Sequence, residues 1–554
     1  MLAVLAPVLA CSSSTPGTPG AGAGTTGGQS ASAAGMPASS GAPSGGQPSS
    51  SGSSSEGGAL GNAGGTGGAL AGATAGGSAG SSGAASTAGA AGAGSLPVLT
   101  EVFGFATTYV DAQNATPFKP TGGEGAPASN VYVVHNRAEL RSALANEKSA
   151  SYASNAAAAL LEPKLIYVVG TIHGDELAGG GTANAAHYRS TPNPNRYDFD
   201  LYLKFFDDAY KADLTSKANG GDTAAAEQLA LVNEQPAAAR TTFSNNQKSQ
   251  IQFQVPPNTS LLGVGTDAKL VDGYLSLNTF SATFGKTLRS NIIIRNMEFQ
   301  APQDLAPAWD PTDTATGAWN ARYDALSIVT SRAIWIDHCT FSDGAHEDNA
   351  EPTPFAGKHV QRHDGLLDIE DGADALTISY SIFKRHDKTM LIGSSGGGDV
   401  GQENLETGRE RVTLFGNLWQ DSTQRDPLAR WGHFHLVNNL YRGGTGANGY
   451  ALSYFIGAGT SSSILSEANA FEQEGASAAT LQGRLVKNSG GTEFHDVGSW
   501  LLGQPFAGLD ALAGGVHTLS WTPPYPYPKA SSAAQLIAYV EANAGSGKLD
   551  IKAP

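Results

Sequence analysis

One short pattern recurs along the chain from residue 291 onward and limits what the chain can fold into. Apolar or β-branched residues alternate, an Asn or Asp often follows, and an aromatic residue ends each segment. The segments end at Phe299, Phe341, Phe383, Trp419, Tyr441 and Phe471. The first three ends are evenly spaced, and the gap from Trp419 to Tyr441 is about half as long. Short strands at regular spacing predict a coil of stacked strands.

This pattern excludes a doubly wound sheet, because parallel strands in such a sheet need a helix in each crossover and none is visible here. A β-sandwich or a propeller is the competing all-β fold. The Asn and the aromatic residue at matched positions favour ladders inside a parallel β-helix. We therefore predict an all-β fold, a single-stranded parallel β-helix, with aromatic residues stacked in its core rather than serving as sugar platforms. Trp419 and Tyr441 are weaker candidates for substrate contact.

Composition divides the 554 residues into three parts. Residues 12–95 are almost wholly Gly, Ala, Ser, Thr and Pro, and such a segment cannot bury enough surface to fold, so we expect a flexible linker. Residues 96–554 remain for the β-helix domain. Residues 1–11 form an apolar run that ends in Cys11, which predicts a lipoprotein signal and a secreted or cell-surface protein. A conventional signal peptide or an uncleaved apolar N-terminus are the alternatives, and no Lys or Arg precedes the run.

Several further elements are expected around the coil. Residues 130–144 have the pattern of a strand followed by a short N-terminal helix, and residues 164–174 that of a buried strand. Residues 175–235 form a polar, Ala-rich insert with a helix over 197–214. Residues 250–277 alternate as strands broken by Pro-Pro and Gly-x-Gly. A C-terminal helix over 531–545 is expected to cap the coil.

Three aspartates lie on successive repeats. Asp364 and Asp368 are four residues apart in HDGLLDIEDG, and Asp324 lies on an earlier repeat, in YDALSI. Carboxylates from stacked turns could converge on one face, and such a set suits Ca²⁺, which takes oxygen ligands with tolerant geometry. From these residues alone, solvated turn residues are the alternative.

Three cations follow the aspartates. Lys388 lies in RHDKTMLIG, and Arg425 and Arg430 are five apart in QRDPLARWGH. Cations at this place could bind an acidic substrate, and solvated surface charge is the alternative. The net charge of −16 argues against a nucleic-acid partner. This negative charge would also repel a polyanionic substrate, so a uronate site would have to be locally basic or filled by a metal.

Histidines near the acidic segment raise the alternative of zinc. They are His338, His346, His359 and His363. They lack a HExxH-type spacing and cysteine partners, so no zinc site is expected, and His338 is expected to be buried and hydrogen-bonded. The chain has two cysteines, which excludes a disulfide framework. Cys339 is expected to be a small buried side chain.

With these motifs the chain resembles the pectate lyase family. The motifs DALSIVTSRAIWIDHCTF, DGLLDI, LTISYSIF, KTMLIG and RDPLARWGHFHLVNNLY match successive motifs of the family in order, and the likeness covers roughly residues 100–550 apart from the insert. The resemblance implies a right-handed parallel β-helix. It also implies a monomeric, calcium-dependent lyase that cleaves de-esterified homogalacturonan (polygalacturonate) by β-elimination to 4,5-unsaturated oligogalacturonides.

The resemblance also implies roles for the residues of the acidic and basic segments. Asp324, Asp364 and Asp368 would bind Ca²⁺. Lys388 would bind the substrate carboxylate, Arg425 would abstract the C5 proton, and Arg430 would hold the substrate and orient the site. Some members carry a further acidic residue where this chain has Arg322, which puts the number of calcium ions in doubt.

Arginine is a difficult base, because its pKa is ordinarily above 12. Crowding among cations would favour a neutral guanidine, so an alkaline rate optimum is expected. Three alternatives remain. They are a pectin lyase on methylated substrate, a glycoside hydrolase, which would need paired carboxylates as acid and base, and a non-catalytic polysaccharide-binding β-helix. Any membrane contact would come through the lipid anchor at Cys11.

Overall fold

The structure, a computed structural model, describes residues 96–111, 114–278, 290–394, 409–447, 449–515 and 518–554. The predicted signal segment 1–11 and the linker 12–95 therefore lie outside the described residues.

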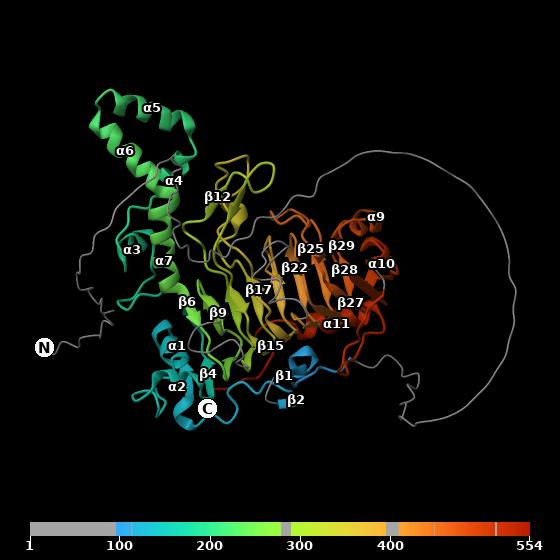
Figure 1. Ribbon diagram of the computed structural model, residues 1–554. Coiled ribbons are helices and arrows are strands. Elements are labelled where there is room, and N and C mark those ends of the chain that lie inside the picture. Colours follow the sequence, from blue (N-terminus) through green and yellow to red (C-terminus); the bar gives the residue numbers. More distant parts are fainter. Residues whose placement is uncertain (1–95, 112–113, 279–289, 395–408, 448, 516–517) are drawn as a thin grey trace, which may run out of the picture. The chain divides into compact units, whose positions relative to one another are not determined.

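Three long sheets wind together into one coil (Figure 1). The first sheet has the strands β3 (Val131–Val134), β4 (Lys164–Val168), β7 (Thr259–Gly263), β10 (Ile292–Arg295), β15 (Arg332–Asp337), β18 (Asp374–Ser379), β21 (Val412–Phe415), β24 (His433–Val437), β27 (Ser463–Glu467) and β30 (Glu493–Val497). The second has β5 (Thr171–His173), β8 (Lys269–Val271), β11 (Glu298–Gln300), β16 (Thr340–Ser342), β19 (Ile382–Lys384), β22 (Leu418–Ser422), β25 (Leu440–Gly443), β28 (Ala470–Glu472), β31 (Trp500–Leu501) and β32 (Gln504–Pro505). The third has β6 (Gln252–Gln254), β9 (Tyr274–Asn278), β14 (Leu326–Val329), β17 (Leu367–Glu370), β20 (Leu391–Ile392), β23 (Leu428–Ala429), β26 (Ile456–Gly459) and β29 (Val486–Ser489).

β3 and β4 both lie in the first sheet. From β4 onward, consecutive strands of the coil enter different sheets, and each strand pairs in parallel with the strand one turn of the coil later. In the third sheet, for example, β14 pairs with β17, β17 with β20, and β20 with β23. β32 departs from this rule, since it returns antiparallel to β31. Two antiparallel hairpins lie outside the coil, β1 (Tyr109–Asp111) with β2 (Asn114–Phe118) and β12 (Ala308–Asp310) with β13 (Ala318–Asn320). The predicted parallel β-helix is confirmed, and the sandwich and the propeller are excluded.

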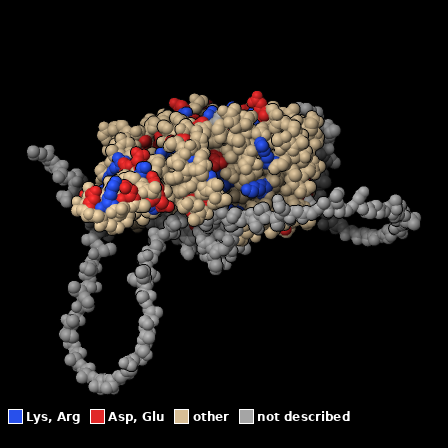
Figure 2. Space-filling model, turned by 90° about the horizontal axis from the view of Figure 1, so that it is seen from above, with Lys and Arg blue, Asp and Glu red and all other residues tan. Residues whose placement is uncertain are grey.

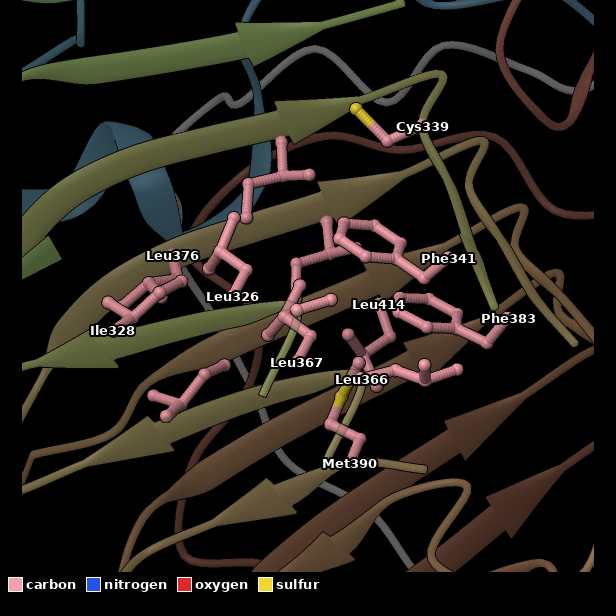
Figure 3. Packing of buried hydrophobic residues seen from close by; sticks show 14 of the residues in the cluster. Leu326, Ile328, Cys339, Phe341, Leu366, Leu367, Leu376, Phe383, Met390 and Leu414 are labelled. Carbon is pink, nitrogen blue, oxygen red and sulfur yellow. The ribbon is translucent and has the colours of Figure 1, made fainter. Parts of the chain in front are cut away.

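The aromatic residues of the repeat form one continuous stack inside the coil. They occupy facing positions of β11, β16, β19, β22, β25 and β28. Successive rings lie 4.8–5.5 Å apart, centre to centre, and within 18° of parallel. Figure 3 shows Phe341 and Phe383 face to face in this core. Trp419 and Tyr441 are fully buried in the stack, so the suggestion that they contact substrate is wrong. Cys339 is buried beside the stack, as predicted.

An asparagine ladder runs beside the stack. Asn417, Asn439 and Asn469 occupy the turns that precede β22, β25 and β28. The Oδ1 of Asn439 accepts from the backbone N–H of Asn417 at 3.0 Å, and the Oδ1 of Asn469 accepts from that of Asn439 at 2.8 Å. Each buried amide thus satisfies the backbone of the preceding turn, which explains why the asparagine recurs with the aromatic residue.

Helices cover the ends and one flank of the coil. Near the N-terminus, α2 (Ala156–Leu161) follows α1 (Arg137–Leu144), and α1 buries Leu140 and Leu144 with the first strands. At the other end lie α9 (Ala478–Gln482) and α10 (Leu509–Leu512) (Figure 1). The C-terminal helix, α11 (Ala533–Asn543), was expected to cap the coil. It instead packs Leu536 and Val540 against Leu440 and other residues on the flank where the first and second sheets meet.

The insert is more helical and longer than predicted. It holds α3 (Ala185–Ser190), α4 (Phe199–Phe205), α5 (Asp208–Asn219), α6 (Thr223–Glu234), a π-helical turn (Gln235–Ala239) and α7 (Arg240–Ile251), which leads into β6. The single helix expected over 197–214 is broken at Phe206 and Asp207, because Asp207 accepts from the Tyr210 N–H and starts α5. Figure 2 shows acidic and basic side chains mixed densely on the side where α5 and α6 lie. Among the described residues, none of the helices combines the length and apolar character needed to cross a membrane.

Candidate active site

The predicted site residues lie along one edge of the third sheet. Asp324, Asp364, Lys388 and Arg425 each stand shortly before the strands β14, β17, β20 and β23, and Asp368 lies within β17. These strands are neighbours in the sheet. Their register aligns the row, since Ser327 faces Asp368, Leu391 faces Leu428, and Lys388 forms a bridge with Gln424. Arg430 directly follows β23. The fold therefore brings all six residues to the same region of the coil.

Asp324 and Asp368 are buried carboxylates, and the charge of Asp368 acts on Asp324. Asp324 accepts from the Gly365 N–H at 2.8 Å and from the Ser327 hydroxyl. Asp368 Oδ1 accepts from the Leu391 N–H at 2.9 Å. Burial, followed by the charges of Asp368 and Asp364, raises the pKa of Asp324 well above its usual range. Burial, followed by the charges of Glu370 and Asp364, raises the pKa of Asp368 to about 8. Crowded, desolvated carboxylates of this kind favour binding of a cation.

Asp364 joins the acidic and the basic parts of the row. Its Oδ1 lies 2.8 Å from Lys388 Nζ, and the Lys388 side chain is 14% exposed. Burial alone would lower the pKa of Lys388, but the neighbouring Asp364 carboxylate raises it overall, while the charge of Arg425 opposes that rise. Lys388 is therefore a fixed ammonium group beside both Asp364 and Arg425.

The two arginines differ in how they are held. The Arg425 charge acts on both Asp368 and Lys388, and its buried Nε has no hydrogen-bond partner within the described part of the chain. Arg425 has a φ of 64°, an uncommon conformation for a non-glycine residue. Arg430 Nη1 donates to the carbonyls of Gly393 and Ser394 at 3.3 and 3.4 Å, directly after β20. Arg430 is thus oriented by the neighbouring turn of the coil.

A buried network behind the row supports Asp364 and was not found from the sequence. His386 Nδ1 lies 2.6 Å from Asp343 Oδ1, and its Nε2 lies 2.8 Å from the Asp364 carbonyl oxygen. Tyr450 OH donates to Asp343 Oδ2 at 3.0 Å. The sequence contained one signal, since His386 stands two residues before Lys388. His386 contacts Asp343, 43 residues before it, and Tyr450 joins the network only through Asp343, so no local pattern connects these residues.

The four histidines considered for zinc do not share one site. His338 is buried, so the predicted burial is confirmed. Its Nδ1 lies 2.9 Å from Asp337 Oδ2. His363 Nδ1 lies 3.1 Å from Asp348 Oδ1, and His359 contacts the Glu351 carbonyl. His346 lies on a cavity next to the second sheet.

Arg322 is bound to the insert rather than to the acidic row. Its Nη1 donates to Ser244 Oγ at 2.8 Å and to Asn245 Oδ1 at 2.9 Å, both on α7. The neighbouring Tyr323 hydroxyl donates to the Ser244 carbonyl at 2.6 Å. A guanidinium therefore stands where some family members carry an acid, and helix α7 fixes this end of the row.

A parallel β-helix with carboxylates and then cations along one sheet fits the class of polysaccharide lyases. A family model described as pectate lyase matches residues 173–549. The chain belongs to the pectate lyase family.

Individual relatives agree with this assignment. A pectate lyase from Bacillus subtilis is 34% identical over 430 residues, which cover 78% of this chain and 90% of that protein. Pectate lyase A from Dickeya chrysanthemi is 38% identical over 310 residues, 56% of this chain and 74% of that protein. A solved structure of a pectate lyase bound to a hexasaccharide has a TM-score of 0.64 at 32% identity, covering 80% of this chain and 97% of that one. The pectate lyase from Acidovorax avenae subsp. citrulli has a TM-score of 0.63 at 28% identity and covers 83% and 98%.

Proposed function

We propose that this pectate lyase is calcium-dependent and cleaves de-esterified homogalacturonan by β-elimination to 4,5-unsaturated oligogalacturonides. The observation that carries the proposal is the continuous row in which Asp324, Asp364 and Asp368 are followed by Lys388 and Arg425. An acidic substrate needs cations, and the removal of a proton next to a carboxylate needs the negative charge on that carboxylate to be neutralised.

The three aspartates fit a calcium ion. They offer only oxygen ligands, which Ca²⁺ prefers, from two neighbouring strands of one sheet. Burial and then the charges of neighbouring carboxylates raise the pKa values of two of them, Asp324 and Asp368, and a bound cation would relieve both effects. When bound, Ca²⁺ would supply positive charge next to the substrate carboxylate.

The cations would perform the remaining steps. Arg425 would take the proton from C5, the bond between C4 and the bridging oxygen would break, a C4–C5 double bond would form, and the departing oxygen would take up a proton from water. Lys388, held by Asp364, would bind the substrate carboxylate, and Arg430 would orient the sugar. Arginine can take a proton only in its neutral form, so the rate should rise from pH 6 to pH 10. A flat profile would contradict an arginine base.

A panel of substrates tests the proposal. Polygalacturonate and highly methylated pectin are each treated with the enzyme in Ca²⁺ and in chelator, and the ultraviolet absorbance of the unsaturated product is followed. We expect absorbance to grow on polygalacturonate with Ca²⁺ and to vanish with chelator. Growth on methylated pectin in chelator would support the pectin lyase alternative. Reducing ends without absorbance would mean hydrolysis, and binding without either would leave a non-catalytic polysaccharide-binding protein.

We also propose a secreted or cell-surface location through a lipid at Cys11, a residue outside the described part of the chain. The support is the apolar run before Cys11 and the Gly/Ser/Ala-rich segment after it. Membrane fractionation of the wild type and of Cys11→Ser tests this proposal. The wild type should sediment with membranes and the variant should not, and equal partitioning of the two would contradict a lipid anchor.

A further inference from the structure

A second group of metal-ligating side chains lies at the edge of the second sheet. β5 ends at His173 and pairs with β8, in which Val271 faces His173. The residues that follow the two strands, Asp175 and Asp272, come together there. A Cβ on Gly174 would lie 2.4 Å from the Asp272 carbonyl oxygen, so only glycine allows the two turns to approach this closely. The Gly174 N–H donates to the Val271 carbonyl at 2.7 Å and fixes the approach.

His173, Asp175 and Asp272 offer ligand atoms that converge. One imidazole nitrogen and one oxygen of each carboxylate all lie within 4.8 Å of one another. Ligands on a Zn²⁺-sized ion lie about 2.0–2.2 Å from it, hence at most about 4.4 Å from each other. A small movement of the exposed His173 side chain would therefore bring all three ligand atoms to coordination distance of one ion.

The two carboxylates of this site also favour a bound cation. Asp175 Oδ1 is buried and has no hydrogen-bond partner among the residues that the structure describes. The two carboxylates face each other. Burial and then the charge of Asp272 raise the pKa of Asp175 to about 6. A buried carboxylate oxygen without a partner normally costs stability, and a metal ion would satisfy it.

A cavity of about 390 Å³ opens beside these residues. His173 and Asp272 line it together with His346 and Asp343, which come from the segment after β16. His346 lines the same cavity as Asp272, but its ring nitrogens lie outside the group of ligand atoms that converge within 4.8 Å. The cavity therefore offers space for an ion with bound water, beside a second imidazole.

We propose that His173, Asp175 and Asp272, with His346, form a site for one divalent transition-metal ion of the zinc class. Imidazole and carboxylate together suit Zn²⁺, Co²⁺, Ni²⁺ and related ions, whereas Ca²⁺ prefers oxygen ligands alone. The site differs in both donor type and sheet from the row of Asp324, Asp364 and Asp368, and it is independent of the proposed calcium dependence.

The ion would stabilise the segment that leads to the active site. That segment carries His346 and Asp343 at its start and Asp364 at its end. Asp343 lines the cavity, and its carboxylate contacts the Nδ1 of His386. The Nε2 of His386 in turn contacts the carbonyl oxygen of Asp364. A cation bound by residues of β5, β8 and this segment would link three turns of the coil. Its role is structural, so it should raise the melting temperature without replacing Ca²⁺ in catalysis.

Metal titration of the full chain, stripped with chelator, tests the proposal. Co²⁺ and Zn²⁺ are added separately, binding is measured by calorimetry, and the visible absorbance of Co²⁺ reports the imidazole ligands. The variants are His173→Ala, Asp272→Asn and, as a matched control, His359→Ala, whose imidazole is exposed and contacts the Glu351 carbonyl. Because His173 is exposed, its variant should fold as the wild type does, which circular dichroism checks.

We expect one equivalent of Co²⁺ or Zn²⁺ to bind the wild type and the control. We also expect at least a tenfold weaker affinity and no Co²⁺ absorbance in His173→Ala and Asp272→Asn. A higher melting temperature with Zn²⁺ should appear in the wild type and control alone. Equal binding to the wild type and His173→Ala would overturn the proposal, as would binding that is lost in Asp368→Asn and not in Asp272→Asn.

Discussion

The His386 imidazole sets a pH-dependent part of the stability. Both ring nitrogens face acceptors, the Asp343 carboxylate at 2.6 Å and the Asp364 carbonyl at 2.8 Å. This geometry favours an imidazolium. Burial alone would lower the pKa of His386, but the Asp343 carboxylate and its hydrogen bond raise it from 6.5 to about 9. A group whose pKa is raised on folding stabilises the protein fully below pH 6.5, and its contribution is lost as the pH rises through about 9.

The magnitude follows from the size of the rise. A rise from 6.5 to about 9 corresponds to about 3 kcal/mol, at about 1.4 kcal/mol per pH unit. His386→Gln keeps a hydrogen-bond donor but carries no charge, and Asp343 then stays buried without its cation. We expect the variant to be less stable than the wild type by about 3 kcal/mol at pH 6 and expect most of that gap to close by pH 10.

Urea unfolding followed by tryptophan fluorescence measures this gap. The wild type and His386→Gln are compared at pH 6, 7.5, 9 and 10 in chelator, with His359→Gln as the control because His359 is exposed. The control should follow the wild type at every pH. A gap of constant size from pH 6 to pH 10 would refute the imidazolium assignment.

Three further predictions follow from the packing and the acidic row. Phe383→Ala removes a ring that stacks on Phe341 and Trp419 at 5.0 and 5.5 Å, so the free energy of unfolding should fall by about 3–5 kcal/mol in urea titrations, and a loss below 1 kcal/mol would contradict the stack as a core element. Lys388→Met should lower kcat/KM on polygalacturonate at least about 100-fold with little change in folding, and retained activity would remove Lys388 from the site. Asp368→Asn should weaken Ca²⁺ binding in calorimetry at least tenfold, yet raise the melting temperature in chelator at pH 9. The reason is that burial raises the pKa of Asp368 to about 8, so its charged form destabilises the metal-free protein above that pH, and a lower melting temperature would contradict this.

The coil was predictable because its signal repeats. Each turn places an aromatic residue at the same interior position. The regular spacing of Phe299, Phe341 and Phe383 therefore predicts the fold, and these residues form the stack. The same holds for Asn417 and Asn439, whose side chains satisfy the backbone of the adjacent turn. The six candidate site residues could be named because they belong to long ordered motifs on consecutive repeats.

Other features could not be predicted, since they depend on contacts between distant residues. Tyr450 and Asp343 meet behind the active site from 107 residues apart, and neither belongs to a local pattern. The insert was placed by composition, but its contact with Arg322 through α7 follows only from the fold. Trp419 was a weaker candidate for substrate contact because it stands near Arg425 in the sequence, but it is buried in the stack like the other aromatic residues of the repeat.

The central claim is that Arg425 is the base of a calcium-dependent elimination. The most direct test compares the wild type, Arg425→Ala and Arg442→Ala on polygalacturonate with Ca²⁺, following the absorbance of the unsaturated product. Arg442 is the matched control, because it forms ion pairs with Glu472 and Glu541 on the surface, away from the third sheet. We expect product from the wild type and from Arg442→Ala, and a rate at least about 1,000-fold lower from Arg425→Ala with normal Ca²⁺ binding. A fully active Arg425→Ala enzyme would contradict the account.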